Sequence, residues 1–248
     1  MKQDEVLLLG SGCGIPVDRH FPPCFMLNFD GKTILVDIGY DTLKHIITLA
    51  NLELIEDIFI THTHPDHFWG LIPLVFYFKC LTQNERKSIY VYGDVKVKDF
   101  LDFIKSYYIW FEKPPEIFFK EVNVSKVYNI GGIKVKTIKT SHSDDSYGYA
   151  FIKGEKKIVF TGDTEFFDEL AIFSKDAYIL VGECSSVSYK KGHMSISDFE
   201  ALVKKSNVKK AVLVHSYNEE GMKEALEKLK ESLGEKLIIG FDGLSIPF

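Results

Sequence analysis

The chain has 248 residues, of which 46% are hydrophobic and 26% charged, and its formal net charge is −5. This composition supplies material for a buried core and excludes a disordered chain, whereas length alone permits either one large domain or two small ones. The negative charge disfavours a protein dedicated to binding phosphate backbones.

We expect neither an export signal at the start of this sequence nor a membrane-spanning segment. The apolar run Val6–Leu9 follows two acidic residues and is too short for a signal peptide. The longest apolar stretch, Leu71–Phe78, contains Pro73 and falls well short of the roughly 20 residues that span a bilayer. The four cysteines form no C-x-x-C pair, so we expect reduced thiols in a cytoplasmic protein.

The first half of the chain alternates strand-like and helix-like segments. Short apolar or period-2 runs bounded by turn residues predict strands at Val6–Leu9, Cys24–Phe29, Thr33–Asp37, Ile58–Thr61 and Ser88–Tyr92. Apolar residues at helical spacing predict helices at Asp41–Ala50, Phe68–Lys79 and Lys96–Tyr108.

The second half repeats this theme. It predicts strands at Ile117–Val122, Ile133–Thr140, Tyr147–Ile152, Ile158–Thr161, Ala177–Val181 and Ala211–Val214, with helices near Ser197–Lys205 and Glu219–Leu233. No linker rich in Pro, Gly or Ser separates the halves. We therefore expect an α/β fold over residues 1–248 as one domain, a four-layer αβ/βα sandwich of two mixed sheets flanked by helices.

The segment Thr61-His62-Thr63-His64-Pro65-Asp66-His67 concentrates the chemistry, because three imidazoles and a carboxylate fall within six residues. Both groups are ligands for zinc and similar divalent ions. Alternation along an extended chain predicts that His62, His64 and Asp66 point the same way, and Pro65 disfavours helical geometry at His64. The spacing excludes the helical H-E-x-x-H pattern of metalloproteases.

This H-x-H-x-D-H string resembles the signature of the metallo-β-lactamase superfamily. Further ligand types then follow in that family's order: His142, Asp163 and His215, each where a predicted strand ends. The resemblance implies that His62, His64 and His142 hold one metal ion, that Asp66, His67 and His215 hold another, and that Asp163 bridges them. Two such ions, about 3.5–4 Å apart, would share a hydroxide made from water. Asp66 would orient or deprotonate that water.

His and Asp ligands accept zinc, manganese and iron alike, and zinc is our expectation for both ions. Several strings resemble ribonuclease Z, a tRNA 3′-processing phosphodiesterase: Gly10-Ser11-Gly12-Cys13-Gly14-Ile15-Pro16, Leu35-Val36-Asp37-Ile38-Gly39, Ser146-Tyr147-Gly148-Tyr149, Gly182-Glu183 and Gly192-His193-Met194-Ser195. The resemblance implies that His193 protonates the leaving oxygen and that Glu183 supports it. General acid catalysis suits phosphodiester cleavage, because an alkoxide leaves poorly.

The chain also departs from ribonuclease Z. Little room remains after His142 for a basic loop, no Gly/Pro-rich arm is evident, and Ser216-Tyr217-Asn218 lacks the arginine often found there. These departures disfavour tRNA, and they favour a small phosphodiester, or a cyclic one as in the phosphodiesterases of phosphonate metabolism. RNA stays among the candidate substrates, and the resemblance implies a homodimer.

Other interpretations remain open. The same metal site fits a hydrolase of carboxylic esters, lactones or thioesters, in which His193 would matter little, and it fits less well a module that binds metal or RNA without turnover. His20 and His45 are interpreted as structural or surface residues. Gly10–Gly14 is interpreted as a tight turn rather than a phosphate-binding loop, since no Gly-Lys-Ser/Thr follows. The aromatic group at 103–111 (Phe103, Tyr107, Tyr108, Trp110 and Phe111) is interpreted mainly as core packing.

Overall fold

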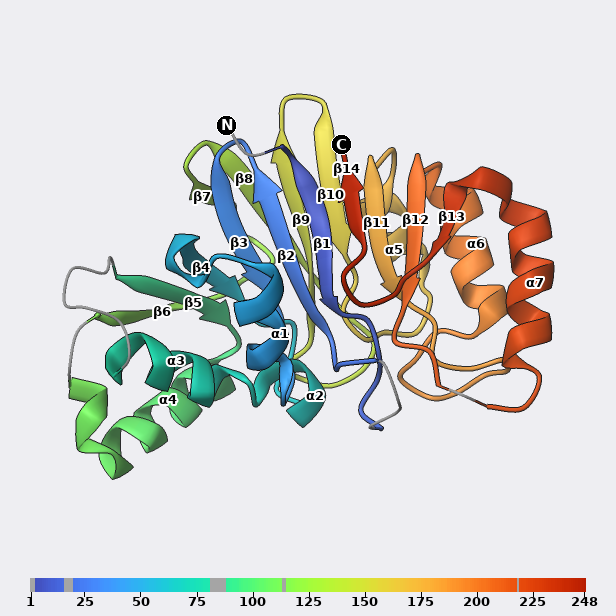
Figure 1. The fold of residues 1–248 in the computed structure, drawn as a ribbon. Coiled ribbons are helices and arrows are strands. Elements are labelled where there is room, and N and C mark those ends of the chain that lie inside the picture. The colour runs from blue at the N-terminus through green and yellow to red at the C-terminus, as the bar shows by residue number, and fades with distance from the viewer. Residues whose placement is uncertain (1–2, 16–19, 81–87, 113–114, 218) are drawn as a thin grey trace.

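The computed structural model describes residues 3–15, 20–80, 88–112, 115–217 and 219–248. These residues form two seven-stranded sheets that pack face to face (Figure 1). Each sheet is antiparallel at one side and parallel at the other. The predicted pair of mixed sheets is therefore confirmed.

The first sheet has the order β14-β1-β2-β3-β4-β5-β6. Its strands are β1 (Glu5–Gly10), β2 (Cys24–Phe29), β3 (Lys32–Val36), β4 (Ile55–Phe59), β5 (Ile89–Gly93), β6 (Ile117–Glu121) and β14 (Ser245–Pro247). β14 pairs antiparallel with β1, which brings the two ends of the described chain side by side (Figure 1).

The second sheet has the order β13-β12-β11-β10-β9-β8-β7. Its strands are β7 (Tyr128–Ile130), β8 (Ile133–Lys139), β9 (Tyr147–Lys153), β10 (Lys156–Phe160), β11 (Ile179–Glu183), β12 (Lys210–Val214) and β13 (Leu237–Ile239). β10 to β13 run parallel, so their carboxyl ends meet at one edge of this sheet.

Helices cover the outer faces of both sheets (Figure 1). On the first sheet lie α1 (Thr42–Leu49), α2 (Pro65–Phe68), α3 (Leu71–Cys80) and α4 (Val95–Tyr107). On the second lie α5 (Asp168–Ser174), α6 (Ile196–Ser206) and α7 (Met222–Leu233). Three 3₁₀ turns complete the described elements: η1 (Leu52–Leu54), η2 (Ile109–Glu112) and η3 (Gly234–Lys236).

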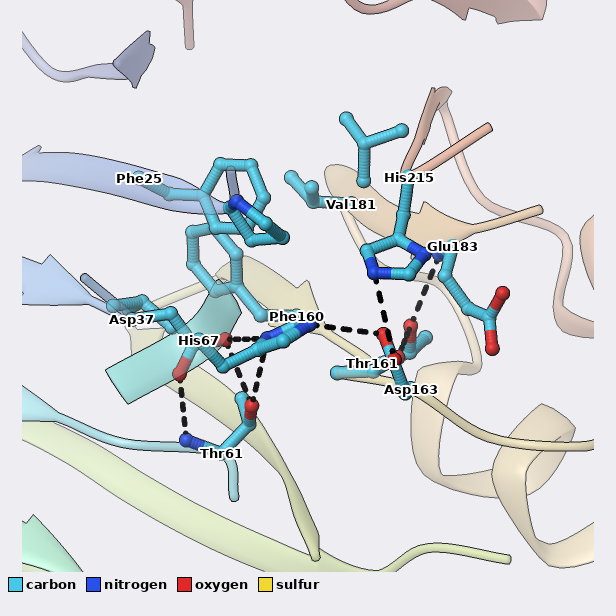
Figure 2. Close-up of a pocket in the computed structure, with 14 residues that line it drawn as sticks. Phe25, Asp37, Thr61, His67, Phe160, Thr161, Asp163, Val181, Glu183 and His215 are labelled. Atoms are coloured by element: carbon cyan, nitrogen blue, oxygen red, sulfur yellow. Dashed lines mark hydrogen bonds and ion pairs between the residues drawn. The ribbon is translucent and has the colours of Figure 1, made fainter. Parts of the chain in front are cut away.

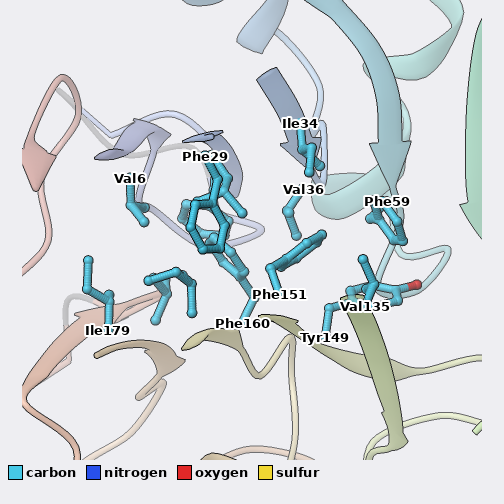
Figure 3. Packing of buried hydrophobic residues seen from close by; sticks show 14 of the residues in the cluster. Val6, Phe29, Ile34, Val36, Phe59, Val135, Tyr149, Phe151, Phe160 and Ile179 are labelled. Atoms are coloured by element: carbon cyan, nitrogen blue, oxygen red, sulfur yellow. The ribbon is translucent and has the colours of Figure 1, made fainter. Parts of the chain in front are cut away.

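Strands such as β1 and β2 are buried on both faces, which explains their continuous apolar runs. Along β1, Val6 and Leu8 enter the cluster between the sheets, whereas Leu7 and Leu9 join the cluster beneath the helices. The cluster between the sheets is rich in aromatic side chains, among them Phe59 and Phe151 (Figure 3). Burial of these alternating faces holds the two sheets at a fixed separation, and with them the loops at their edges.

Two local predictions were wrong. The helix predicted at Phe68–Lys79 is broken, since α2 ends at Phe68 and α3 begins at Leu71. Between them Gly70 donates its N–H to the Ile38 carbonyl, 2.9 Å away, and a Cβ there would lie 2.3 Å from the Gly39 carbonyl oxygen. The chain is therefore pinned at a glycine, where only a bare backbone fits.

The second error concerns Asp66. Pro65 is the first residue of α2, and His64 has extended dihedrals (φ −66°, ψ 146°), as its position before proline predicts. Asp66 is therefore helical, and simple alternation does not set its direction. Among the described residues, Asp66 shares a candidate metal-binding group with His67 and His215, and none with His62 or His64.

Among the described residues, no helix is both long and apolar enough to cross a membrane.

Candidate metal centre

The predicted ligands meet at one edge of the two sheets, where strands from both sheets end. His62 and His64 follow β4 of the first sheet, and Asp66 and His67 lie in α2. The remaining ligands follow strands of the second sheet: His142 after β8, Asp163 after β10 and His215 after β12. Strand ends separated by up to 153 positions in the chain thus supply one cluster.

The described residues contain five overlapping groups of three side chains that could hold a metal ion, and two of them are the sets expected from the sequence for the separate ions. In the first, His62, His64 and His142 bring their ligand atoms within 4.8 Å of one another. The Nε2 atom of His142 lies 3.0 Å from Nδ1 of His64, and the Nδ1 atom of His142 lies 2.7 Å from the Gly192 carbonyl oxygen. Because the Gly192 carbonyl accepts a hydrogen bond from the Nδ1–H group of His142, the Nε2 atom of His142 keeps a lone pair for a metal ion.

The second group consists of Asp66, His67 and His215. Oδ2 of Asp66 lies 3.2 Å from Nε2 of His215 and 3.6 Å from Nε2 of His67. His215 has a left-handed backbone (φ 61°), a conformation that non-glycine residues adopt rarely and that surrounding contacts must maintain.

Asp163 lies between the two groups. Its Oδ1 atom is 3.3 Å from Nε2 of His67, and its Oδ2 atom is 3.5 Å from Nε2 of His215 and 3.8 Å from Nε2 of His142. One carboxylate therefore reaches members of both groups. This is the position that the sequence resemblance implied for a bridging ligand.

The electrostatics of the cluster differ between its imidazoles. Burial opposes a charge on His67, but the carboxylates of Asp163, Asp66 and Asp37 outweigh burial and raise the pKa of His67 well above its usual range. Burial lowers the pKa of His62 well below its usual range, and the neighbouring His67 lowers it further. Burial alone would raise the pKa of Asp163, but His215 and His67 outweigh it and hold that pKa well below the ordinary value. Neutral imidazole and carboxylate are the forms that coordinate metal ions.

The residues present fit divalent metal ions. Within the described part of the chain, Nε2 of His62 and Nε2 of His67 are buried and have no hydrogen-bond partner. Buried polar atoms are rarely left unpaired, because losing water without compensation costs free energy. An ion bound by these nitrogens would satisfy both, and nitrogen and carboxylate donors suit zinc, manganese or iron. His64 is exposed, so the cluster is open to solvent on that side.

His193 and Glu183 lie beside the cluster. Glu183 is the last residue of β11, and His193 precedes α6. Nδ1 of His193 is 3.0 Å from Oε1 of Glu183 and 3.7 Å from Oδ2 of Asp163. Burial, followed by the charge of Asp163, raises the pKa of Glu183 to about 8. The contact with Glu183 occupies Nδ1 and leaves Nε2 of His193 for a substrate atom.

Asp37 contacts a candidate ligand, and the sequence analysis quoted it in a motif without giving it a role. Its Oδ2 atom accepts a hydrogen bond from Nδ1 of His67 at 2.8 Å, and its Oδ1 atom accepts one from the Thr61 N–H at 2.7 Å (Figure 2). A carboxylate on the far nitrogen fixes the tautomer and orientation of a metal-binding imidazole. The sequence signal is an acidic residue at the end of an apolar strand, one strand before the histidine motif.

The glycine-rich segment after β1 lies against Asp66. A Cβ on Gly14 would lie 3.0 Å from Oδ2 of Asp66, and one on Gly10 would lie 1.9 Å from the Pro22 carbonyl oxygen. Close backbone approach, rather than phosphate binding, explains these glycines. Pro16, the last residue of that motif, lies outside the described residues.

The remaining candidates lie outside the ligand groups of the described residues. Nδ1 of His45 contacts the Leu9 carbonyl oxygen at 2.6 Å, and Nδ1 of His20 contacts the Ser11 hydroxyl at 3.2 Å. The core interpretation of the aromatic group is wrong for Phe103, Tyr107 and Tyr108, which are 56%, 71% and 44% exposed. Phe111 is buried as predicted, whereas the side chain of Trp110 lies outside the described part.

Comparison with known proteins adds a family match to this geometry. A family model described as "Anti-Pycsar protein Apyc1" matches residues 5–235, which is most of the chain. Ribonuclease Z of Thermococcus sibiricus is 26% identical, and the match covers 96% of this chain and 94% of that protein.

Solved structures agree on the fold. The metallo-beta-lactamase fold protein YhfI from Bacillus subtilis superposes with a TM-score of 0.86 at 19% identity, covering 100% of both chains. The short form of human tRNase Z (ELAC1) superposes with a TM-score of 0.77 at 19% identity, covering 98% of each chain. The predicted metallo-β-lactamase fold is thereby confirmed.

Proposed function

The chain belongs to the family described as anti-Pycsar protein Apyc1, and from that premise we propose that it is a two-metal phosphodiesterase for small or cyclic phosphodiesters. Its ribonuclease Z-like relatives and its histidine and aspartate groups support the coarser assignment, a metal-dependent hydrolase of the phosphodiesterase type. RNA is the competing substrate. Both sheets contribute to the candidate site, which supports treating residues 1–248 as a single domain.

Two divalent ions, most simply zinc, would be held by His62, His64 and His142 on one side and by Asp66, His67 and His215 on the other, with Asp163 between them. Such ions neutralise phosphate charge and lower the pKa of water toward roughly 7. His67 and His215 hold the pKa of Asp66 below its usual range although burial opposes them, so its carboxylate is ionised and can orient a water.

The pair His193–Glu183 carries the choice of a phosphodiester over a carbonyl substrate. Nδ1 of His193 lies 3.0 Å from the Glu183 carboxyl, so a protonated His193 ring can give its Nε2 proton to a leaving oxygen and become neutral imidazole. The side chain of His193 is 12% exposed, so a bound substrate can reach it. Ester, lactone and thioester hydrolysis depends less on such a donor.

The acidic chain and the short segment between His142 and β9 favour small substrates over tRNA. In the described residues β8 and β9 are joined within seven positions, which leaves no space there for an added basic loop. The homodimer that the resemblance implies stays a prediction, which sedimentation of the purified chain would test.

The first experiment compares turnover of bis-p-nitrophenyl phosphate, a lactone and a thioester by protein loaded with Zn²⁺ or Mn²⁺. His62→Ala serves as the blank, and His45→Gln is the matched control, because His45 lies outside the ligand groups. We expect diester cleavage that is lost in His62→Ala and kept in His45→Gln. Turnover of the carbonyl compounds alone would assign the protein to the alternative branch.

A second comparison separates the phosphodiesters themselves: a cyclic nucleotide, a linear dinucleotide and a tRNA with a 3′ extension. Faster cleavage of the two small substrates supports the proposal. Efficient removal of the tRNA extension would contradict the preference for small substrates while leaving the phosphodiesterase assignment intact. Tight RNA binding without any hydrolysis would favour a binding module.

A further inference from the structure

Two buried carboxylates that belong to neither ligand group each support a different half of the candidate centre. They are Asp145, in the loop between β8 and β9, and Asp242, between β13 and β14. Their side chains are 5% and 7% exposed. Burial of an ionised group requires hydrogen-bond partners, and the partners of these two carboxylates include Thr63, Ser143 and Ser11, which lie in loops that carry or contact candidate metal ligands.

Asp145 joins the two loops that carry His62, His64 and His142. Its Oδ2 atom accepts hydrogen bonds from the N–H and hydroxyl groups of Thr63, at 2.9 and 2.5 Å. Its Oδ1 atom accepts a hydrogen bond from the Ser143 hydroxyl at 2.8 Å and lies 3.4 Å from the Lys96 ammonium. Thr63 separates His62 from His64, and Ser143 follows His142. One carboxylate therefore links the loop that carries His62 and His64 to the loop that carries His142.

Asp242 contacts both ends of the glycine-rich loop after β1, of which residues 11–15, 20 and 21 are described. Its Oδ1 atom accepts hydrogen bonds from the N–H and hydroxyl groups of Ser11, at 2.8 and 2.7 Å. Its Oδ2 atom accepts a hydrogen bond from the Phe21 N–H at 2.6 Å. Ser11 and Phe21 lie on either side of this loop, and Gly12 donates its N–H to the Phe21 carbonyl. The loop is thus held from the carboxyl-terminal end of the chain.

The supported loop contacts two members of the second group. The Ser11 carbonyl accepts the N–H of His215 at 2.8 Å, which helps to hold the left-handed backbone of that residue. Gly14 approaches Asp66 so closely that an added Cβ would lie 3.0 Å from its carboxylate. Displacement of this loop would therefore affect His215 and Asp66 together, and it has no comparable contact with His64 or His142 in the described residues.

We propose that Asp145 and Asp242 are positioning residues, each of which sets metal affinity in one half of the centre only. Asp145 acts on the group His62, His64 and His142 through Thr63 and Ser143. Asp242 acts on the group Asp66, His67 and His215 through Ser11. The inference rests on the two-ion site of the proposed function and not on the identity of the substrate.

The test is titration of the metal-stripped full chain with Co²⁺, followed by absorbance, and with Zn²⁺ in competition with a chelator. His64→Ala and His67→Ala identify which binding step belongs to which group. We expect Asp145→Asn to weaken the step that His64→Ala removes by about 10- to 100-fold, and Asp242→Asn to weaken the step that His67→Ala removes by a similar factor. The other step in each variant should change by less than about threefold.

Asn has nearly the volume of Asp, but its amide nitrogen is a donor at a position where a carboxylate oxygen accepts a hydrogen bond in the wild-type chain. Asp4→Asn is the matched control, since Asp4 accepts the Asp30 N–H at 2.8 Å in a turn that contacts no ligand group. We expect both steps to be unchanged in that variant. If either asparagine variant fails to fold, Ser143→Ala removes one hydrogen bond to Asp145 and Ser11→Ala removes one to Asp242, together with the contact to His20. Each serine variant should weaken the same binding step as the asparagine variant that it replaces.

Equal weakening of both steps in each variant would overturn the inference, as would unchanged affinities or a single binding step in the wild-type chain. Selective weakening in a protein that cleaves no phosphodiester would uphold the inference and refute the proposed substrate class. The metal titrations and the turnover assays can therefore fail separately.

Discussion

Nδ1 of His193 lies 3.0 Å from Oε1 of Glu183, and the same oxygen accepts the Thr164 N–H at 2.9 Å. The carboxyl is thus held from the loop after β10, and the orientation of the imidazole depends on a fixed partner. A histidine supported in this way is suited to give a proton from its other nitrogen.

We expect His193→Ala to lower cleavage of a phosphodiester with an alkoxide leaving group by about 10²- to 10⁴-fold, which is the usual contribution of a general acid. The loss should be smaller with a p-nitrophenolate leaving group, because that group leaves with little protonation. Metal content, measured by elemental analysis, should be unchanged. Equal losses on both substrates, accompanied by loss of metal, would make His193 a ligand rather than an acid.

We expect Asp37→Asn to weaken metal binding by about 10- to 100-fold. The Asp37 carboxylate accepts hydrogen bonds from His67 and Thr61. The side-chain amide of asparagine would place an N–H donor opposite one of these donors. Competition with a chromophoric chelator measures the effect. Asp57→Asn is the control, because Asp57 is a buried carboxylate of β4 that accepts the Tyr92 hydroxyl at 3.1 Å; unchanged affinity is expected there.

Phe59→Ala should destabilise the protein by about 3–5 kcal/mol. The Phe59 ring is fully buried between the sheets near Tyr149 and Phe151 (Figure 3). Its centroid lies 5.1 Å from the centroid of each of those rings, edge-on, and 4.2 Å from that of Tyr92, on which it stacks. Urea denaturation of the metal-free protein measures the loss. Phe103→Ala, at a residue that is 56% exposed, should change stability by about 0.5 kcal/mol or less. Similar losses in both variants would contradict the assigned core.

The contribution of Asp145 to stability should depend on pH. Burial raises the pKa of Asp145, but hydrogen bonds from Thr63 and Ser143 outweigh burial and hold the pKa well below its ordinary value of 3.8. Since the folded pKa is the lower one, the unfolded chain binds more protons between the two values, and stability there rises with pH. The contribution is complete above 3.8 and is lost as the pH falls through the folded value.

Denaturation of metal-free wild type and Asp145→Asn at about pH 7, 5 and 3 measures this contribution. We expect the difference in unfolding free energy to be the same at the two higher values and to narrow at the lowest. A difference that stays constant, or that widens on acidification, would show that the Asp145 carboxylate is not held in its ionised form by the folded protein.

The strands and the order of the candidate ligands could be predicted because both are local in the sequence. β2 was predicted with its observed bounds, since a strand buried on both faces is a continuous apolar run between turns. The fold class followed from two similar sets of such runs. Ligand types that directly follow predicted strands, such as His142 and His215, could be found by their position in the sequence alone.

Short or weakly patterned elements were missed because tertiary packing stabilises them. β13 has three residues and β14 has three, and each is a strand through its pairing with a longer neighbour, β12 or β1. β7 and the seven-residue helix α5 were missed for the same reason. Elements this short have too few residues for a periodic pattern, and propensity is a weak guide to them.

By itself the sequence determined which side chains are available for metal chemistry and that they follow strands of an αβ/βα sandwich. Only the tertiary structure decided which carboxylates hold those side chains in place. Asp242 and Ser11 are separated by 231 positions, and Asp145 and Thr63 by 82. No local pattern marks a supporting carboxylate, because its role depends on hydrogen bonds that exist only after distant loops have been brought together by the packing of the two sheets.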